Sequence, residues 1–362
     1  MKPEYRQMPP GGLVRIEGDE GIRFGTFMFN PHSLIAARLL DRDPAAQIDV
    51  DWLRTRLREA IVLRERVCDT AFHRLVHAEA DRLPGLVLDR YDDVAVLQAN
   101  TAGMDRLTPL IVEALIGMLP LRAVVARNDS TVRRQEGLGE DVALLFGDDA
   151  RADVVEGGVR FPIDPLSGQK TGWFYDQRPN RDRVAALADG ARVLDVFSHV
   201  GAFGLRCALA GAREVTLVDS SAAALAHAEQ AAALNGVAER VHVRREDAFE
   251  AMTALAGERF DIVVCDPPAF AKSRKDADAG LRAYGRMARL AAPLVAPGGF
   301  LFVASCSYHA ALEPWTAQIA FGLHRARREG RILVTAGAGP DHPVHPHLPE
   351  TAYLKAQLIQ VL

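Results

Sequence analysis

Residues 193–205 read VLDVFSHVGAFGL, and this stretch decides the fold: an apolar strand, a turn that contains glycine, and then a helix. From about residue 176 onward, apolar strands and helical stretches alternate regularly. The strand candidates are ARVLDV, EVTLVD, RVHVRR, FDIVVCD and GFLFVAS, followed by ILVTAG and AYLKAQLIQVL. Apolar strands separated by helices are typical of a parallel sheet covered on both faces. The sequence therefore predicts an α/β domain with a seven-stranded sheet whose last strand runs antiparallel.

The residues before this domain show a different pattern of predicted strands and helices. Short strands broken by Gly, Asn and Pro predict a small β module at residues 1–46. Residues 47–165 mix strands and helices, which predicts a middle α/β domain. The regular β/α alternation then defines a third domain at residues 166–362.

Two local elements of the middle domain are well marked. The sequence DVVEGGVRFPID predicts a hairpin in which Gly157 and Gly158 supply the turn. Residues 50–67 show the apolar spacing of a helix, with one face formed by Trp52, Leu53, Leu57, Ile61 and Leu63.

The composition is that of an ordinary globular protein, with 49% hydrophobic and 25% charged residues in a chain of 362. No apolar run reaches the ~18 residues of a membrane span, and the N-terminus lacks a secretory signal. The four cysteines lack the paired spacing of a disulfide framework or a zinc site. We therefore expect a cytoplasmic protein that contacts no membrane and holds no metal. A net charge of −4 disfavours a protein that coats nucleic acid, but it allows an enzyme with a local basic mouth.

The glycine turn indicates the kind of ligand, because open α/β sheets bind ligands at the carboxyl ends of their strands. A dinucleotide site requires G-x-G-x-x-G, whereas residues 199–204 read HVGAFG and lack the first glycine. S-adenosylmethionine, a nucleoside without a pyrophosphate, fits this turn. Such turns also serve tight helix packing. The cofactor interpretation is favoured by Asp195, Asp219 for the ribose hydroxyls and Asp247 for the adenine amine, which end three successive strands.

The fourth strand of this domain ends in Asp266-Pro267-Pro268-Ala-Phe270. Two consecutive prolines stiffen the chain and remove two backbone donors. Such a bend after a parallel strand is a good platform beside a reacting methyl group. With Asp266 before the bend and Phe270 and Lys272 after it, we interpret it as part of a site rather than as a simple strand terminator.

The fifth strand runs into Ser-Cys306-Ser-Tyr308-His. Free cysteines are usually small buried apolar residues, and we interpret Cys68, Cys207 and Cys265 in this way. Cys306 differs because serines flank it at the end of an apolar strand. Methylation of C5 in a pyrimidine requires a thiolate that adds to C6, whereas methylation of a nitrogen requires no cysteine. Cys306 is therefore a candidate nucleophile, and Asp266 is a candidate to stabilise the adduct near base N3.

With these motifs in view, nearly the whole chain resembles the bacterial large-subunit ribosomal RNA 5-methylcytosine methyltransferases that use a single cysteine. The motifs that carry the resemblance are LPGLVLDRYDDVAVLQ (83–98), GQKTGWFYDQRPNR (168–181), VLDVFSHVGAFGL (193–205), DPPAF (266–270), PGGFLFVASCS (297–307) and DHPVHPHLPETAYLK (341–355). The turn departs from the family's usual pattern at His199, Val200 and Ala202, and Ala269 stands where the family has lysine.

The resemblance implies a class I Rossmann-like methyltransferase domain at 166–362, preceded by the middle domain and by a short PUA-like module at 1–46. It implies S-adenosylmethionine as cofactor, Cys306 as nucleophile and Asp266 as the acid beside base and cofactor. It places at the cofactor site Gln177, Arg178, Phe197, Ser198, Gly201 and Pro267, in addition to the acidic residues. Because a stacked base cannot reach both Cys306 and the methyl group, the expected partner is single-stranded or opened ribosomal RNA. Candidate substrate contacts are Phe270, Lys272 and Tyr308.

Several alternatives stay open at this level. A guanine N7 or N2 methyltransferase on the same fold would lack the cysteine, and a non-catalytic RNA-binding protein would not need the set of acidic residues. A Rossmann dehydrogenase is disfavoured by the missing glycine. His342, His345 and His347 are interpreted as part of a proline-rich loop rather than as metal ligands. The sequence leaves open the modified nucleotide, naked RNA or a ribosomal particle as substrate, and whether the protein is a homodimer.

Overall fold

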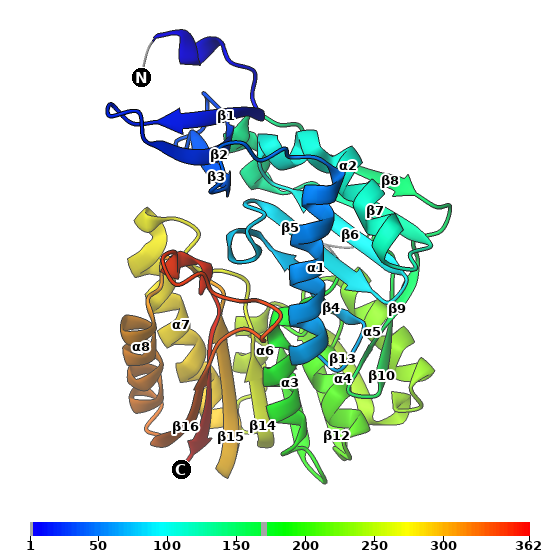
Figure 1. Cartoon of the computed structure of the whole chain (residues 1–362). Helices are drawn as coiled ribbons and strands as arrows, with labels where there is room; N and C mark the ends of the chain where they lie inside the picture. Colours follow the sequence, from blue (N-terminus) through cyan, green and yellow to red (C-terminus); the bar gives the residue numbers. More distant parts are fainter. Residues whose placement is uncertain (1–2, 168–171) are drawn as a thin grey trace. The chain divides into compact units, whose positions relative to one another are not determined.

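The computed structural model describes residues 3–167 and 172–362 (Figure 1). In this part the chain divides into two compact units. Unit 1 comprises Met1–Val154, Pro162–Tyr175 and Pro340–Thr351. Unit 2 comprises Val155–Phe161, Asp176–Gly339 and Ala352–Leu362. Residues 168–171, which open the GQKTG motif, lie outside the described residues.

A mixed sheet forms the centre of unit 2. Within the described residues it has seven strands in the order β13-β12-β11-β14-β15-β17-β16. The strands are β11 (Arg192–Val196), β12 (Glu214–Asp219), β13 (Val241–Arg245), β14 (Phe260–Cys265), β15 (Val295–Ser305), β16 (Gly330–Ala336) and β17 (Lys355–Val361). The first five strands in this order pair in parallel, and β17 pairs antiparallel with both β15 and β16. The predicted α/β fold is confirmed, including the antiparallel last strand.

Helices of unit 2 pack against this sheet. On one face, buried residues of α6, α7 and α8 form a continuous apolar core with alternate residues of the strands, such as Leu194 and Val196 of β11. The intervening residue of β11, Asp195, accepts a hydrogen bond from α4. The helices are α3 (Arg178–Ala185), α4 (Ala202–Leu209), α5 (Ala222–Leu234), α6 (Ala248–Ala254), α7 (Ala277–Ala291) and α8 (Leu312–Arg325).

Unit 1 contains two further sheets. One is a three-stranded antiparallel sheet of β1 (Gly12–Glu17), β2 (Arg23–Phe29) and β3 (Ala37–Asp41). The other has the order β4-β5-β6-β7-β8, with strands β4 (Phe72–His77), β5 (Leu86–Tyr91), β6 (Val94–Ala99), β7 (Ala123–Asn128) and β8 (Asp141–Phe146). Helices α1 (Val50–Val67) and α2 (Ala102–Met118) share an apolar core with this sheet. No helix in residues 3–167 and 172–362 is long and apolar enough to cross a membrane.

The hairpin of β9 (Ala152–Glu156) and β10 (Val159–Ile163) turns at Gly157 and Gly158, as predicted. Both glycines have positive φ, 53° and 81°, a conformation that favours glycine. The predicted helix at 50–67 is also confirmed. Its predicted apolar face was partly wrong, because Leu63 is exposed and Arg64 is fully buried.

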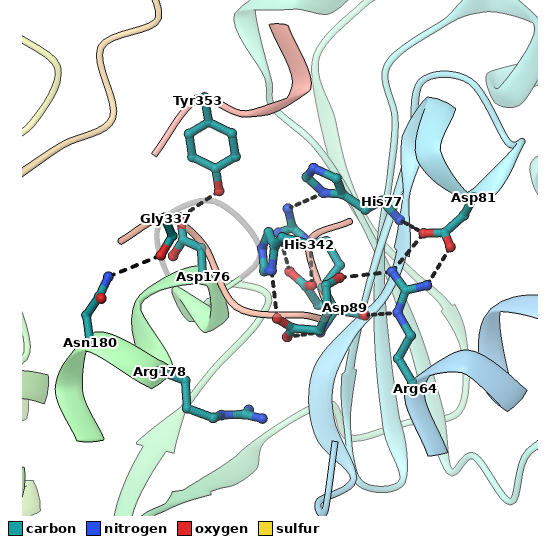
Figure 2. Close-up of polar contacts among 12 residues, drawn as sticks. Arg64, His77, Asp81, Asp89, Asp176, Arg178, Asn180, Gly337, His342 and Tyr353 are labelled. Carbon is teal, nitrogen blue, oxygen red and sulfur yellow. Dashed lines mark hydrogen bonds and ion pairs between the residues drawn. The ribbon is translucent and has the colours of Figure 1, made fainter. Parts of the chain in front are cut away.

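Arg64 is buried because every side of its guanidinium has an acceptor (Figure 2). It forms a two-pronged ion pair with Asp81, with one contact of 2.7 Å, and it donates to the Asp341 carbonyl at 2.9 Å and the Arg74 carbonyl at 2.9 Å. A buried charge is tolerated only when it is paired in this way. Arg64 thus fastens the segment Pro340–Thr351 to α1 within unit 1.

Two histidines adjoin this ion pair. His342 Nδ1 lies 2.9 Å from Asp341 Oδ1, and its ring centroid lies 5.0 Å from that of His77. Burial lowers the pKa of His77 to about 2, helped by electrostatic interactions with His342, Arg74 and Arg64. His77 is therefore a neutral part of the cluster. Within the described ranges, no group of three His, Cys, Asp or Glu side chains is arranged to hold a metal ion.

Replacing Arg64 by Met should destabilise unit 1 by about 3–5 kcal/mol, because Asp81 would be left as an uncompensated buried charge. Hydrogen–deuterium exchange of peptides from α1 and residues 340–347 should report this as faster exchange. Arg54→Met on the same helix is the matched control, since Arg54 pairs with exposed Asp51 and should cost at most about 1 kcal/mol. Equal exchange rates of these peptides in the two variants would contradict the role of Arg64 in holding Pro340–Thr351 against α1.

Candidate active site

Four neighbouring strands of unit 2 end at the same edge of the sheet. Val196 of β11 pairs with Val218 of β12 and with Cys265 of β14, and Cys265 pairs with Val303 of β15. The residues that follow these pairs therefore gather at one edge. They include the predicted site residues Phe197, Ser198, Asp219, Asp266 and Cys306.

The turn after β11 has an unusual backbone. Phe197 and His199 have φ values of 62° and 51°, and Gly201 follows with 74°. The His199 amide donates to Asp219 Oδ2 at 2.9 Å, and the Ser198 amide donates to the Val218 carbonyl at 3.0 Å. Non-glycine residues with positive φ are uncommon and cluster at ligand sites, where surrounding bonds hold them.

Ser198 supplies the observation that fits a cofactor to this turn. Its side chain is 6% exposed, and its Oγ has no hydrogen-bond partner among the described residues. Buried polar atoms are nearly always paired, so an orphaned hydroxyl beside a strained turn is a place for a polar ligand group. The sequence placed Ser198 at the cofactor site through the resemblance.

The glycines of the turn also serve packing. A Cβ on Gly204 would lie 2.3 Å from Leu217 Cδ2, and one on Gly201 would lie 2.8 Å from Leu217 Cδ1. Only glycine lets α4 approach β12 this closely. The packing interpretation and the ligand interpretation of these glycines are thus compatible.

The three acidic residues assigned to the cofactor lie in different surroundings. Asp195 is 1% exposed, and its Oδ2 accepts the Gly204 amide at 2.9 Å. Asp219 is half-buried, and its two oxygens accept the amides of His199 and Ser221. Asp247 is exposed and caps α6 through Oδ1. Asp195 therefore holds the first turn of α4 through the Gly204 amide, while Asp219 and Asp247 are accessible to a ligand.

Burial raises the pKa of the Asp195 carboxyl to about 8. The Gly204 amide lowers this pKa, whereas the negative charges of Asp266 and Asp219 raise it. These interactions place Asp195, Asp219 and Asp266 within electrostatic range of one another. A cluster of acidic groups with a perturbed pKa at a strand edge is typical of a functional site.

Gln177 and Arg178, which the resemblance assigned to the cofactor, make contacts within the protein. Gln177 is buried, and its Oε1 accepts a hydrogen bond from the side-chain Nδ2 of Asn180 at 2.7 Å. Arg178 lies 3.5 Å from Glu156 of the hairpin. Buried Arg181 also pairs with Glu156, and the charge of Asp266 helps to raise the pKa of Arg181. The start of α3 thus connects the hairpin to the acidic edge.

The neighbouring Asp176 is the first residue of the DQR sequence, and Figure 2 shows it facing Tyr353. The Tyr353 hydroxyl donates to Asp176 Oδ2 at 2.6 Å, and the Asp176 carbonyl accepts the Gly339 amide at 3.0 Å. Asp176 therefore joins the residues before α3 to the two segments that flank β16 and β17.

The bend after β14 leads into an aromatic cluster. Pro267 is buried, and Phe270 is half-buried with its ring centroid 6.1 Å from Phe197 and 4.7 Å from Tyr284. Phe249 completes the cluster at 6.0 Å from Phe270. Phe270 therefore has a packing role, whereas Lys272 and Tyr308 are exposed, with Tyr308 57% exposed.

Cys306 follows β15 and is half-buried, unlike Cys207 and Cys265, which are fully buried. Burial raises the pKa of both buried thiols. Cys68, expected to be buried, is half-buried at the end of α1. Cys306 is thus a partly accessible thiol at the edge that also carries Asp266 and the glycine turn.

A buried hydrogen-bond network fixes the backbone around Cys306. Ser305 Oγ lies 2.8 Å from the Tyr284 hydroxyl, which lies 2.9 Å from Ser307 Oγ, and the Ala271 amide donates to Ser307 Oγ at 3.1 Å. The two serines were noticed in the sequence, but Tyr284 and Lys355, which contacts Ser307, were missed. The apolar spacing of α7 could have indicated Tyr284 as a core residue, but nothing in the sequence paired it with the serines.

Comparisons with known proteins agree with this architecture. The model of a family described as S-adenosylmethionine-dependent methyltransferases matches residues 139–360. The chain is 35% identical to a ribosomal RNA large subunit methyltransferase of Deinococcus radiodurans, covering 100% of this chain and 91% of the relative. It is 34% identical to ribosomal RNA large subunit methyltransferase I of Aeromonas hydrophila, covering 97% and 90%.

Solved structures show the same fold. A methyltransferase structure in complex with SAH superposes with a TM-score of 0.83 at 19% identity, covering 97% of this chain and 92% of that one. An S-adenosylmethionine-dependent methyltransferase from Streptococcus mutans superposes with a TM-score of 0.82 at 19% identity, with the same coverage.

The raised pKa of Asp195 gives a prediction about stability and pH. Between the ordinary pKa of an unfolded aspartate, about 4, and the folded value of about 8, the folded state binds the extra proton. This residue should therefore make stability fall as pH rises through that window, by up to about 1.4 kcal/mol per pH unit. Asp195→Asn removes this titration. The melting temperature of the variant minus that of wild type should therefore increase as the pH rises to about 8 and stay constant above it.

Thermal melting between pH 5 and 9 provides the measurement. Glu229→Gln, on the exposed face of α5, is the control and should follow wild type across the range. An Asp195→Asn curve that stays parallel to wild type from pH 5 to 8 would show that the buried carboxyl is ionised throughout.

Proposed function

Because this chain belongs to the family of S-adenosylmethionine-dependent methyltransferases, we propose that it methylates C5 of a cytosine in large-subunit ribosomal RNA. The observation that carries the proposal is the half-buried Cys306 at the strand edge shared with Asp266. Relatives that align over at least nine-tenths of their length and bear the name ribosomal RNA large subunit methyltransferase support the substrate class.

S-adenosylmethionine, when bound, supplies an electrophilic methyl group. We assign Ser198 Oγ, the Asp219 carboxylate and the exposed Asp247 to hold it, because these groups line the turn and the two strand ends next to it. Phe197 and Pro267 border the same edge. Asp195 supports the cofactor site through its bond to the Gly204 amide of α4, and Gln177 and Arg178 do so through their contacts at the start of α3.

Cys306 acts on the base. Its thiolate Sγ bonds to C6 of the cytosine, which places electron density on C5 and allows C5 to take the methyl group. Water then takes the C5 proton, and the electrons of the C5–H bond restore the C5–C6 double bond as the C6–Sγ bond breaks and returns the thiolate. We propose that Asp266, which follows the neighbouring strand β14, holds N3 of the base while the bond to C6 exists.

The base must leave its stack to reach Cys306, which costs a few kcal/mol and is cheapest in loops. We therefore propose a single-stranded or locally opened RNA segment as substrate. Exposed Tyr308 is the stacking partner and exposed Lys272 is the phosphate contact. We also propose half-buried Phe270, which packs in the aromatic cluster at the same edge, as a contact of the base.

We also propose that the chain consists of three domains, divided after residues 46 and 165. The three strands β1, β2 and β3 form a sheet of their own, as the later strands of a PUA-like module would. The five-stranded sheet with α1 and α2 corresponds to the middle domain. We propose that the methyltransferase domain from 166 to 362, of which residues 166–175 and Pro340–Thr351 belong to unit 1, carries the cofactor and the nucleophile.

Replacing Asp219 by Ala should weaken cofactor binding by roughly 1.5–3 kcal/mol, the value of hydrogen bonds to a charged group. Calorimetry with S-adenosylhomocysteine measures this directly. Glu214→Gln at the opposite end of β12 is the control and should bind as wild type does. Tight NAD binding with no heat from S-adenosylhomocysteine would contradict the cofactor site.

Replacing Cys306 by Ala should reduce methyl transfer by several orders of magnitude while leaving cofactor affinity nearly unchanged, because only the covalent step is lost. The assay follows methyl incorporation into large-subunit ribosomal RNA from a strain that lacks the enzyme. Cys68→Ala removes a half-buried thiol of unit 1 and should retain activity.

RNA that carries 5-fluorocytosine at the target tests the same step independently. Fluorine cannot leave C5 as a proton does, so wild-type protein should remain bonded to the RNA through Cys306. A Cys306→Ala protein that still methylates at the wild-type rate, together with no trapped adduct in wild type, would overturn the cytosine assignment in favour of a guanine methyltransferase.

A further inference from the structure

Lys355 lies beside the backbone of Cys306. It is the first residue of β17, and in the antiparallel register it pairs with Ser305, the residue before Cys306. Its Nζ donates to the carbonyl of Ser307, the residue after Cys306, at 2.8 Å and to the Tyr353 carbonyl at 3.1 Å. The ammonium group is therefore held across the segment that carries the thiol.

The backbone segment around Cys306 and the Lys355 side chain are both held in place. Ser305 and Ser307 are fully buried and bonded to the Tyr284 hydroxyl, so the segment cannot shift freely relative to β17. Lys355 itself is half-buried. A surface lysine would keep its ammonium in water, whereas this one spends two of its three donors on backbone carbonyls at the site.

The charge balance at this place is also informative. Burial lowers the pKa of Lys355, and the only opposing influence resolved for it is the charge of Cys306, which raises it. The two groups are thus close enough for each to favour the ionised form of the other. Partial burial strengthens such an interaction, because the effective dielectric constant is lower than in water.

We propose that Lys355 stabilises the thiolate of Cys306 and so keeps this cysteine ready to act as a nucleophile. On ionisation the thiol proton passes to solvent, and the resulting anion faces the ammonium group. Lys355 is a positioning residue, since it acts through Cys306. The inference rests on the proposed function only for the use to which the thiolate is put.

Other titratable groups around Cys306 set the background for this effect. Asp266 follows the adjacent strand β14, and its negative charge opposes ionisation of the thiol. Tyr284 of α7 stays neutral, because burial raises its pKa. Tyr308 and His309 follow Cys306 on its own loop, and Tyr353 precedes Lys355. Within this set, Lys355 supplies the positive charge that opposes the negative charge of Asp266.

The test measures how fast iodoacetamide alkylates Cys306 of the full-length protein between pH 5.5 and 10, with the modified peptide quantified by mass spectrometry. Only the thiolate reacts, so the midpoint of the profile gives the thiol pKa. Lys355→Met and Lys355→Gln should raise the midpoint by about one unit, a roughly tenfold slower reaction at pH 7. Glutamine retains a donor for the Ser307 carbonyl without the charge.

Two controls separate charge from structure. Lys355→Arg retains a cation and should restore most of the wild-type profile, and Lys275→Met removes an exposed charge of the same sign and should leave it unchanged. Circular dichroism and binding of S-adenosylhomocysteine identify which neutral variant keeps the native fold. A natively folded neutral variant whose midpoint equals that of wild type would overturn the proposal.

The alkylation profile uses no RNA, so its outcome is independent of the substrate. A raised midpoint in the neutral variants combined with no 5-fluorocytosine adduct in wild type would uphold the role of Lys355 and reject the cytosine assignment. An adduct combined with an unchanged midpoint would do the reverse.

Discussion

The close approach of α4 to β11 and β12 is the constraint on which the rest of the site depends. Gly204 leaves no room for a side chain against Leu217, and its amide is held by the buried carboxyl of Asp195. This approach determines where the turn from Phe197 to Gly201 can run, and the turn in turn holds His199 against Asp219. A larger residue at 204 would displace the helix, the strained turn and the acidic edge together.

The architecture could be predicted from the sequence because strands, helices and turns are encoded by residues close together in the chain. Apolar strands alternating with helices predicted the seven-stranded sheet, and a pair of glycines predicted the turn of the hairpin. The sequence also drew attention to Cys306, because serines flank it at the end of an otherwise apolar strand. The helix at 50–67 was predicted with its correct bounds, but Leu63 was placed on the apolar face although it is exposed, and the burial of Arg64 was not predicted.

What the sequence could not provide were polar contacts between distant residues. Arg181 and Glu156 are 25 positions apart, Tyr284 and Ser307 are 23 apart, and Lys355 and Ser307 are 48 apart. Each pair is meaningful only after the strands have been placed in register. A buried arginine or lysine looks like a surface residue until its acceptors are known, because burial of a charge depends entirely on its partners. The resemblance supplied roles for Gln177 and Arg178, but their contacts with Asn180 and Glu156 required coordinates.

The bond between Arg64 and the Asp341 carbonyl has a consequence for biosynthesis, because 277 residues separate its partners. Translation proceeds at about 5–20 residues per second, so roughly 14–55 s pass between synthesis of the two. During that interval the Arg64 guanidinium can bond to Asp81 and to the Arg74 carbonyl, but the acceptor in Pro340–Thr351 does not yet exist. Synthesis of unit 1 therefore begins first on the ribosome, and its last segment is made only after most of unit 2 has been synthesised.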